Sequence, residues 1–143
     1  AFGPYLADLL RGPGDKAVGR AIADAVGARA FDATGKYEVL GSASLIRQAT
    51  GVIAHDSGAM HVASAFRKNV VSVWGNTVPQ FGMGPYIPTH PERAHISEVL
   101  GLPCRPCSKI GFAQCPKGHF HCMERQDLDR IAMWAQEEPS RAT

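Results

Sequence analysis

The spacing of apolar residues changes twice along the chain and divides it into three zones. In residues 1–50, apolar side chains recur at intervals of three and four, which is typical of amphipathic helices. This spacing predicts a helix over about 15–26 that buries one face, and a second helix that Ser42 caps and that ends before Gly51. The apolar positions are Ala17, Val18, Ala21, Ile22, Ala25 and Val26 in the first helix and Leu45, Ile46 and Ala49 in the second.

Two short apolar runs, over residues 52–54 and 70–74, mark the second zone. Each run is expected to be a strand, and residues 58–66 between them are expected to form a short helix. A strand, a tight turn, a helix and a strand make a βαβ unit, which almost always belongs to a parallel sheet covered by helices. The pattern therefore predicts an α/β fold, with Trp74 in the core. The buried face of the short helix is expected to comprise Ala59, Val62, Ala63 and Phe66.

Proline and glycine interrupt the third zone, residues 76–124, which is expected to be rich in loops. One short element is expected over 94–100. A closing helix is expected near 125–138, with a polar tail that frays after 137. The apolar stripe of that helix is Leu128, Ile131, Ala132 and Ala135.

Composition limits the class of protein further. With 143 residues, of which 45% are hydrophobic, the chain has the size of one domain and enough apolar material for a core, which excludes disorder over most of its length. Its 15 Lys and Arg against 13 Asp and Glu give a net charge of only +2, so no global attraction to nucleic acid or a membrane surface is expected. We expect no membrane span and no secretory signal, and therefore cysteines that are reduced or bound to metal.

A polar turn over residues 55–61 follows the first expected strand and opens the short helix. Unpaired backbone N–H groups and the helix dipole favour an anion at such a helix start, and Gly58 would let a phosphate approach the backbone. The ordinary alternative is that Asp56 or Ser57 simply caps the helix. From these features alone both interpretations stay open.

A second turn, residues 75–85, follows the next strand at the same edge of the sheet. Asn76 and Thr77 offer short hydrogen-bonding groups there. An ordinary long loop is the alternative, although structureless loops of this length are uncommon in compact domains and are often functional.

Five motifs together resemble glycosyltransferase family 9, the lipopolysaccharide heptosyltransferases and their relatives. They cover nearly the whole chain, and their order is more specific than any one of them. A departure precedes the first motif, where Leu9-Leu10-Arg11 stands in place of the full apolar strand of the family. The motifs are Gly12-Pro13-Gly14-Asp15, Asp32-Ala33-Thr34-Gly35, the segment from Asp56 to Ala63, the segment from Val73 to Pro79, and the series Cys104-Arg105-Pro106-Cys107, Cys115-Pro116, His119 and Cys122-Met123.

The resemblance implies a two-lobed GT-B glycosyltransferase with Rossmann-like lobes, of which residues 1–143 would form the single C-terminal lobe that binds a nucleotide-sugar donor such as ADP-heptose. The acceptor lobe, with the catalytic base, would be absent, so no catalytic residue is expected here and the chain alone would be inactive. Transfer would invert the anomeric centre without a cofactor. Donor contacts would come from Asp56, Ser57, Gly58, Ala59, Met60 and His61 at the diphosphate, with Asp15, Asn76 and Thr77 as further contacts.

The partners that the resemblance implies are the nucleotide sugar and a glycan or lipid-linked acceptor. It implies neither a nucleic acid nor more than a peripheral association with a membrane. The expected location is the cytoplasm, at the inner face of the bacterial inner membrane, where cell-envelope glycans are assembled.

Four cysteines lie within nineteen residues with the spacing C-x2-C-x7-C-x6-C. Four thiolates at such spacing can close a structural zinc site, whereas free cysteines can also pack as small hydrophobes, and no metal is assigned. The basic residues around them leave a second function open, a non-catalytic nucleotide- or nucleic-acid-binding module with a zinc knuckle of four cysteines. We expect Cys104, Cys107, Cys115 and Cys122 to lie within a few ångströms of one another, with or without a metal.

Overall fold

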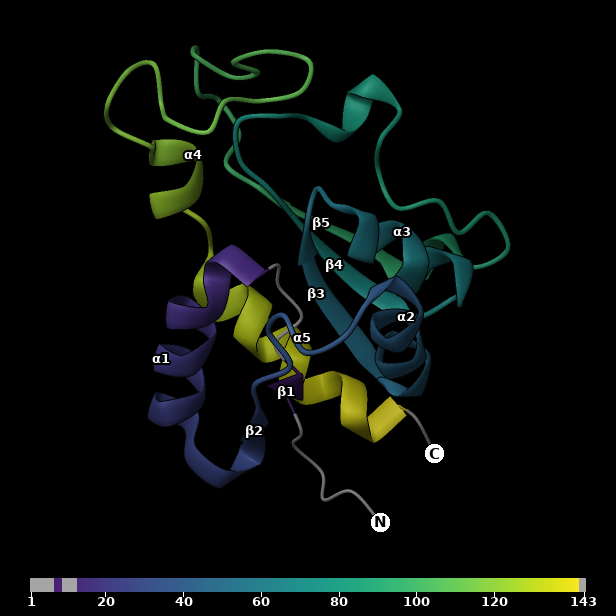
Figure 1. The fold of residues 1–143 in the computed structure, drawn as a ribbon. Helices are drawn as coiled ribbons and strands as arrows, with labels where there is room; N and C mark the ends of the chain where they lie inside the picture. Colours follow the sequence, from purple (N-terminus) through teal and green to yellow (C-terminus); the bar gives the residue numbers. More distant parts are fainter. Residues whose placement is uncertain (1–6, 9–12, 142–143) are drawn as a thin grey trace. The chain divides into compact units, whose positions relative to one another are not determined.

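The computed structural model describes residues 7–8 and 13–141, and side chains within 14–137 (Figure 1). Residues 9–11, where the sequence departs from the full apolar strand of the resembled family, lie outside the described residues. The chain divides into two compact units, Ala1–Gln48 and Ala49–Thr143, and each is described by itself.

The first unit contains a two-stranded parallel sheet and two helices (Figure 1). Strand β1, Ala7–Asp8, pairs with β2, Ala30–Phe31. Helix α1, Lys16–Val26, ends at Gly27, whose φ of 76° lies in the left-handed region that glycine adopts without strain. Helix α2 covers Val39–Gln48, and short 3-10 helices cover Pro13–Asp15 and Gly27–Arg29.

The prediction for α1 was correct in its bounds but wrong in its burial. The side chains of Val18, Ile22 and Val26 are 47%, 38% and 42% exposed, and the apolar stripe lines an open surface hollow. The described sheet of this unit has two strands of two residues each, which offer too little surface to cover the stripe.

The prediction for α2 was wrong at its start. Ser42 lies inside the helix and donates its N–H to Glu38 O at 2.9 Å, so it caps nothing. Ile46 is buried as predicted.

The second unit is built on three parallel strands in the order β3-β4-β5. The α/β fold with a parallel, Rossmann-like sheet is thereby confirmed. β4 lies in the middle and is almost wholly buried, with Val70 and Trp74 at 0% exposure. The elements of the βαβ unit and its neighbour are β3, Gly51–His55; α3, Gly58–Ala65; β4, Asn69–Trp74; and β5, Ala94–Glu98.

The buried face of helix α3 agrees only in part with the prediction: Ala63 is buried as predicted, and Ala59 and Val62 are half-buried. Met60, Ala63 and Ser64 are buried, whereas Phe66 is 40% exposed just beyond the helix end. The Ser64 hydroxyl donates to Met60 O at 2.9 Å, which explains how a polar side chain can lie on the buried face.

The chain after β5 passes through the long loop of residues 99–120 and closes with two helices. The closing helix begins at Leu128 instead of 125 and is helical to Arg141, and the fraying expected for residues 137–143 stays a prediction. Its predicted stripe is largely exposed, with Leu128 at 70%. No helix among the described residues is long and apolar enough to cross a membrane. The remaining elements are 3-10 helices over Pro79–Phe81 and Pro91–Arg93, and helices α4, His121–Glu124, and α5, Leu128–Arg141.

Candidate functional site

The turn between β3 and α3 presents backbone donors at the carboxyl end of the sheet. Ser57 occupies the N-cap position in an extended conformation, φ −158° and ψ 165°, but its side chain makes no capping hydrogen bond. The Met60 N–H bonds back to Ser57 O at 3.2 Å. The N–H groups of Gly58 and Ala59, the first two of the helix, have no partner within it. The Ser57 side chain therefore does not cap the helix, although the residue occupies the N-cap position.

Neither its backbone conformation nor its packing requires residue 58 to be a glycine. Its φ lies outside the left-handed region, and a Cβ atom added to it would meet nothing within 4 Å. Glycine inside a helix costs about 1 kcal/mol relative to alanine. The open space above Gly58 leaves room for a ligand to approach its N–H group.

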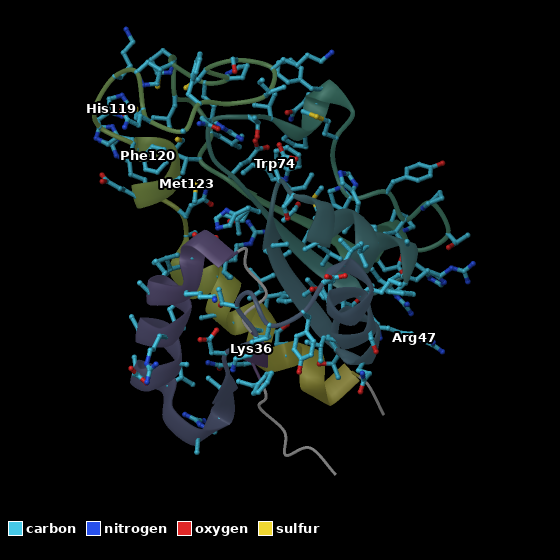
Figure 2. All side chains as sticks on the ribbon, in the orientation of Figure 1. Lys36, Arg47, Trp74, His119, Phe120 and Met123 are labelled. Carbon is cyan, nitrogen blue, oxygen red and sulfur yellow. The ribbon has the colours of Figure 1, made fainter. Side chains whose placement is uncertain are left out.

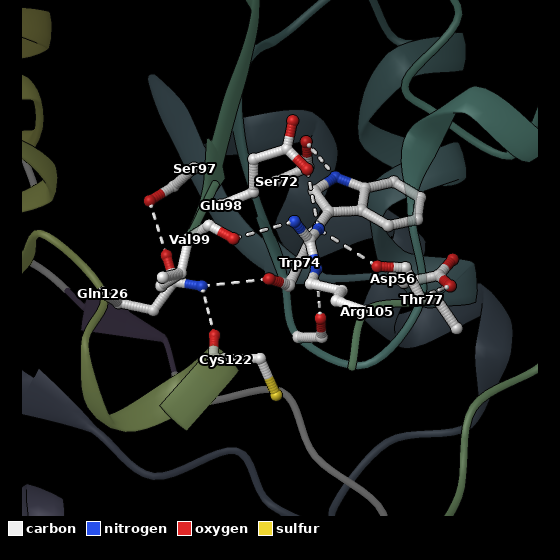
Figure 3. A network of polar contacts seen from close by, with 11 residues as sticks. Asp56, Ser72, Trp74, Thr77, Ser97, Glu98, Val99, Arg105, Cys122 and Gln126 are labelled. Carbon is white, nitrogen blue, oxygen red and sulfur yellow. Dashed lines mark hydrogen bonds and ion pairs between the residues drawn. The ribbon is translucent and has the colours of Figure 1, made fainter. Parts of the chain in front are cut away.

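Asp56 joins this turn to the loop that follows β4. The Thr77 hydroxyl donates to Asp56 Oδ2 at 2.9 Å, and Thr77 is 5% exposed (Figure 3). The carboxylate is therefore engaged in holding two loops together, which is the turn-holding role that the sequence indicated for it.

The structure thus brings most of the predicted donor residues to one edge of the sheet. Met60 is buried and its N–H bonds to Ser57 O, whereas His61 is exposed on α3. Asn76 donates its side-chain N–H to Phe112 O at 2.7 Å. Asp15 belongs to the first unit, and its donor contact stays a prediction.

Arg105 is a residue of this region whose role sequence reasoning missed (Figure 3). Its guanidinium pairs with Glu98 at 2.7 Å, and the two side chains are only 6% and 14% exposed. It also donates to three carbonyls, Gly75 O at 2.6 Å, Thr77 O at 3.1 Å and Val99 O at 3.2 Å. One side chain thereby fixes the β4 loop to the end of β5. In the sequence it stands among other basic loop residues, and no local pattern distinguishes it from them.

Gln126 is a second buried link that the sequence did not reveal. Its amide Nε2 donates to Trp74 O at 2.9 Å and to Cys122 O at 2.8 Å, and its Oε1 accepts from the Ser97 hydroxyl at 2.9 Å. The segment between α4 and α5 is thereby tied to the ends of β4 and β5. Trp74 is in the core as predicted, and its indole N–H donates to Ser72 Oγ at 2.9 Å (Figures 2 and 3).

The segment 104–122, here called the Cys loop, contains all four cysteines, and all four are free. Burial raises the pKa of the Cys107 and Cys122 thiols, whereas the Phe120 N–H, 3.4 Å from Cys115 Sγ, is the main cause that lowers the pKa of Cys115. Electrostatic interactions connect Cys107 to Cys104 and Cys115, and connect Cys122 to Cys107 and Cys115. That all four thiols lie within a few ångströms of one another stays a prediction. Among the described residues, no three His, Cys, Asp or Glu side chains are already placed around a metal position.

Comparison with known proteins is consistent with this geometry. Residues 9–116 match the model of "Glycosyltransferase family 9 (heptosyltransferase)". The chain therefore belongs to glycosyltransferase family 9.

A structural comparison supports the same fold. The crystal structure of the glycosyl transferase family 9 from Veillonella parvula DSM 2008 is similar to the chain, with a TM-score of 0.69 and 20% identity. The match covers 96% of this chain and 37% of that one, so the chain spans little more than a third of the length of that protein. No curated protein matches the chain.

Proposed function

We propose that the chain forms the donor-binding lobe of an inverting glycosyltransferase and binds the diphosphate of a nucleotide sugar at the turn between β3 and α3. The observation that carries this proposal is the exposed helix start at Gly58, where two backbone N–H groups have no partner within the helix and a Cβ would meet nothing. Family membership supports the class of reaction.

The electrostatics of the turn suit a diphosphate. Backbone N–H groups and the positive end of the α3 dipole both stabilise negative charge, and they would act most strongly as the diphosphate departs. The Asp56 carboxylate would repel a phosphate if it faced one, but its Oδ2 is held by the Thr77 hydroxyl. His61, exposed on the first turn of α3, would bind the diphosphate from the side.

The rest of the reaction is proposed from the family. The donor would be ADP-heptose or a similar nucleotide sugar, and the acceptor a glycan or a lipid-linked glycan in lipopolysaccharide or cell-envelope synthesis. A second lobe would hold the acceptor and the base, because displacement needs an acceptor oxygen in line with the anomeric carbon. The enzyme would work in the cytoplasm at the inner face of the membrane, with at most a peripheral association.

Calorimetry with three ligands tests the proposal. The protein should bind ADP weakly and AMP more weakly still, because AMP lacks the second phosphate that the N–H groups would hold. Adenosine should show the weakest binding of the three. Equal affinity for ADP and adenosine would contradict a diphosphate site at this turn.

A transfer assay with candidate donors and acceptors complements the calorimetry. The 143-residue chain should transfer no sugar, because no carboxylate in it has a motif for the base. Measurable turnover would show that the base lies on this lobe.

A further inference from the structure

We propose that Arg105 is a positioning residue for the diphosphate site and acts through Thr77 on the Asp56 carboxylate. The inference rests on the proposed donor binding at the β3–α3 turn, and it adds the residue that keeps this turn suited to an anion. Arg105 does not itself bind phosphate in this assignment, because each of its three guanidinium nitrogens already donates to an acceptor of the protein.

A carboxylate at the end of β5 holds Arg105 in place. Glu98 is the last residue of β5, and its Oε2 accepts from Arg105 Nη2 at 2.7 Å. Both side chains are largely buried, where water screens a charge pair only weakly. The guanidinium also donates to Gly75 O and Val99 O. Because its donors form a rigid planar fork, these partners together fix both its position and its orientation.

Two hydrogen bonds lead from this guanidinium to the turn before α3 (Figure 3). Arg105 Nη2 donates to Thr77 O at 3.1 Å, and the Thr77 hydroxyl donates to Asp56 Oδ2 at 2.9 Å. Asp56 directly precedes Ser57, which occupies the N-cap position of α3. The position of the guanidinium therefore determines where the carboxylate beside the helix start is held.

The place of that carboxylate matters for charge. The start of α3 favours a negative group, whether a phosphate or a nearby carboxylate. A released Asp56 side chain would accept from the first N–H groups of the helix, as aspartates at helix starts commonly do, and would repel a phosphate there. The bond from Thr77 instead holds the carboxylate against the loop after β4. Arg105 would thus support anion binding by restraining a competing anion.

The loop after β4 has further attachments, so a conservative change at Arg105 should displace Thr77 without releasing the whole loop. The Cys107 N–H donates to Asn76 O at 2.9 Å, and Asn76 Nδ2 donates to Phe112 O at 2.7 Å. Lysine at position 105 would keep a positive charge beside Glu98. Its ammonium group on a flexible stem lacks the fork that reaches several acceptors at once. Arg105→Lys is therefore the informative variant.

Calorimetry with ADP is the first test. Arg105→Lys should weaken ADP binding by about five- to tenfold, which corresponds to one net hydrogen bond. Arg93→Lys is the matched control, because Arg93 Nη1 also donates to a backbone carbonyl, Arg67 O at 2.8 Å, but near the amino ends of β4 and β5. This control should stay within about twofold of the unmodified protein. An unchanged ADP affinity in Arg105→Lys would overturn the proposal.

A substitution at Asp56 separates positioning from a general structural loss. Asp56→Asn removes the charge but keeps an oxygen that accepts from the Thr77 hydroxyl. In the Asp56→Asn background, the further change Arg105→Lys should weaken ADP binding by less than about twofold, because a displaced amide does not repel a phosphate. The same five- to tenfold loss in both backgrounds would show that Arg105 does not act through Asp56.

Amide NMR spectra without ligand distinguish a failure of this inference from a failure of the proposed function. The Gly58 signal should move in Arg105→Lys and in Thr77→Val, and should keep its place in Arg93→Lys. If the unmodified protein binds no ADP, the donor site is contradicted, and these shifts alone decide whether Arg105 positions the turn. A Gly58 signal unmoved in Arg105→Lys would overturn the positioning role. If Arg105→Lys does not fold, Thr77→Val, which breaks the next bond, decides by the same measurements.

Discussion

The two loops at the carboxyl edge of the sheet are built in opposite ways. The β3–α3 turn is exposed at Ser57 and Gly58, and its backbone donors have no partner within the helix. The loop after β4 is held by Arg105, by Asp56 and by the Cys loop, and Thr77 in it is buried. The difference indicates a division of roles. The first loop would offer groups to the proposed ligand, and the second would form a fixed wall beside it.

The largest expected effect is on stability, at the loop after β4. Arg105→Ala should destabilise the protein by about 3–5 kcal/mol, because it leaves Glu98 as an unpaired buried carboxylate and removes donors from three carbonyls. Urea unfolding measures this. The exposed Arg47→Ala should stay within about 0.5 kcal/mol of the unmodified protein (Figure 2). An equal loss of unfolding free energy in the two variants would show that Arg105 does not hold the loop after β4 in place.

The second effect is on the open turn. Gly58→Val should remove measurable ADP binding, because a branched side chain fills the space above the N–H groups, while leaving the protein folded, since no atom lies there to clash. Ala65→Val, which adds the same branched side chain at the exposed far end of α3, is the matched control and should bind ADP normally. ADP affinity that is equal in the two variants would contradict a ligand at Gly58.

His61→Ala should lower the affinity for ADP without lowering the stability of the protein. The side chain is exposed, so its removal should leave the unfolding free energy nearly unchanged. Loss of a charge-assisted hydrogen bond to the diphosphate should weaken ADP binding by about 1–3 kcal/mol. Calorimetry and urea unfolding on the same preparation check both parts, and an unchanged ADP affinity would place His61 outside the site.

The smallest effect concerns the bond that joins the two loops. A double-mutant cycle of Thr77→Val and Asp56→Ala should give a coupling free energy of about 0.5–1.5 kcal/mol, because each single variant removes the same hydrogen bond. Ser44→Ala with Gln48→Ala, an exposed pair on α2, should couple less. Purely additive losses at Thr77 and Asp56 would show that the two loops are held independently.

The sequence was most informative where burial and local pattern agree. The apolar run of β4 lies between two other strands, and its pattern predicted a strand with Trp74 in the core. The stripe of α1 predicted a helix, but whether such a stripe is covered depends on neighbouring elements that its own sequence does not encode.

The site was predictable only in part, for a similar reason. The turn at Gly58 could be inferred because a strand end, a glycine and a helix start are adjacent in sequence. The links that Arg105 and Gln126 make to the end of β4 could not be inferred, because Thr77 and Trp74 lie 28 and 52 residues away from them in the sequence. Single polar residues in a loop carry no periodicity that would indicate such distant acceptors.

The carbonyl groups along the sheet edge also determine how water is oriented there. Arg105 and Gln126 donate to the carbonyl oxygens of Gly75, Thr77, Val99 and Trp74, groups that would otherwise present acceptors to solvent. The first two N–H groups of α3 lie at the same edge and have no partner within the helix, so water bound to them would present its oxygen atoms. If a diphosphate binds there as proposed, phosphate oxygens would take the places of those water oxygens.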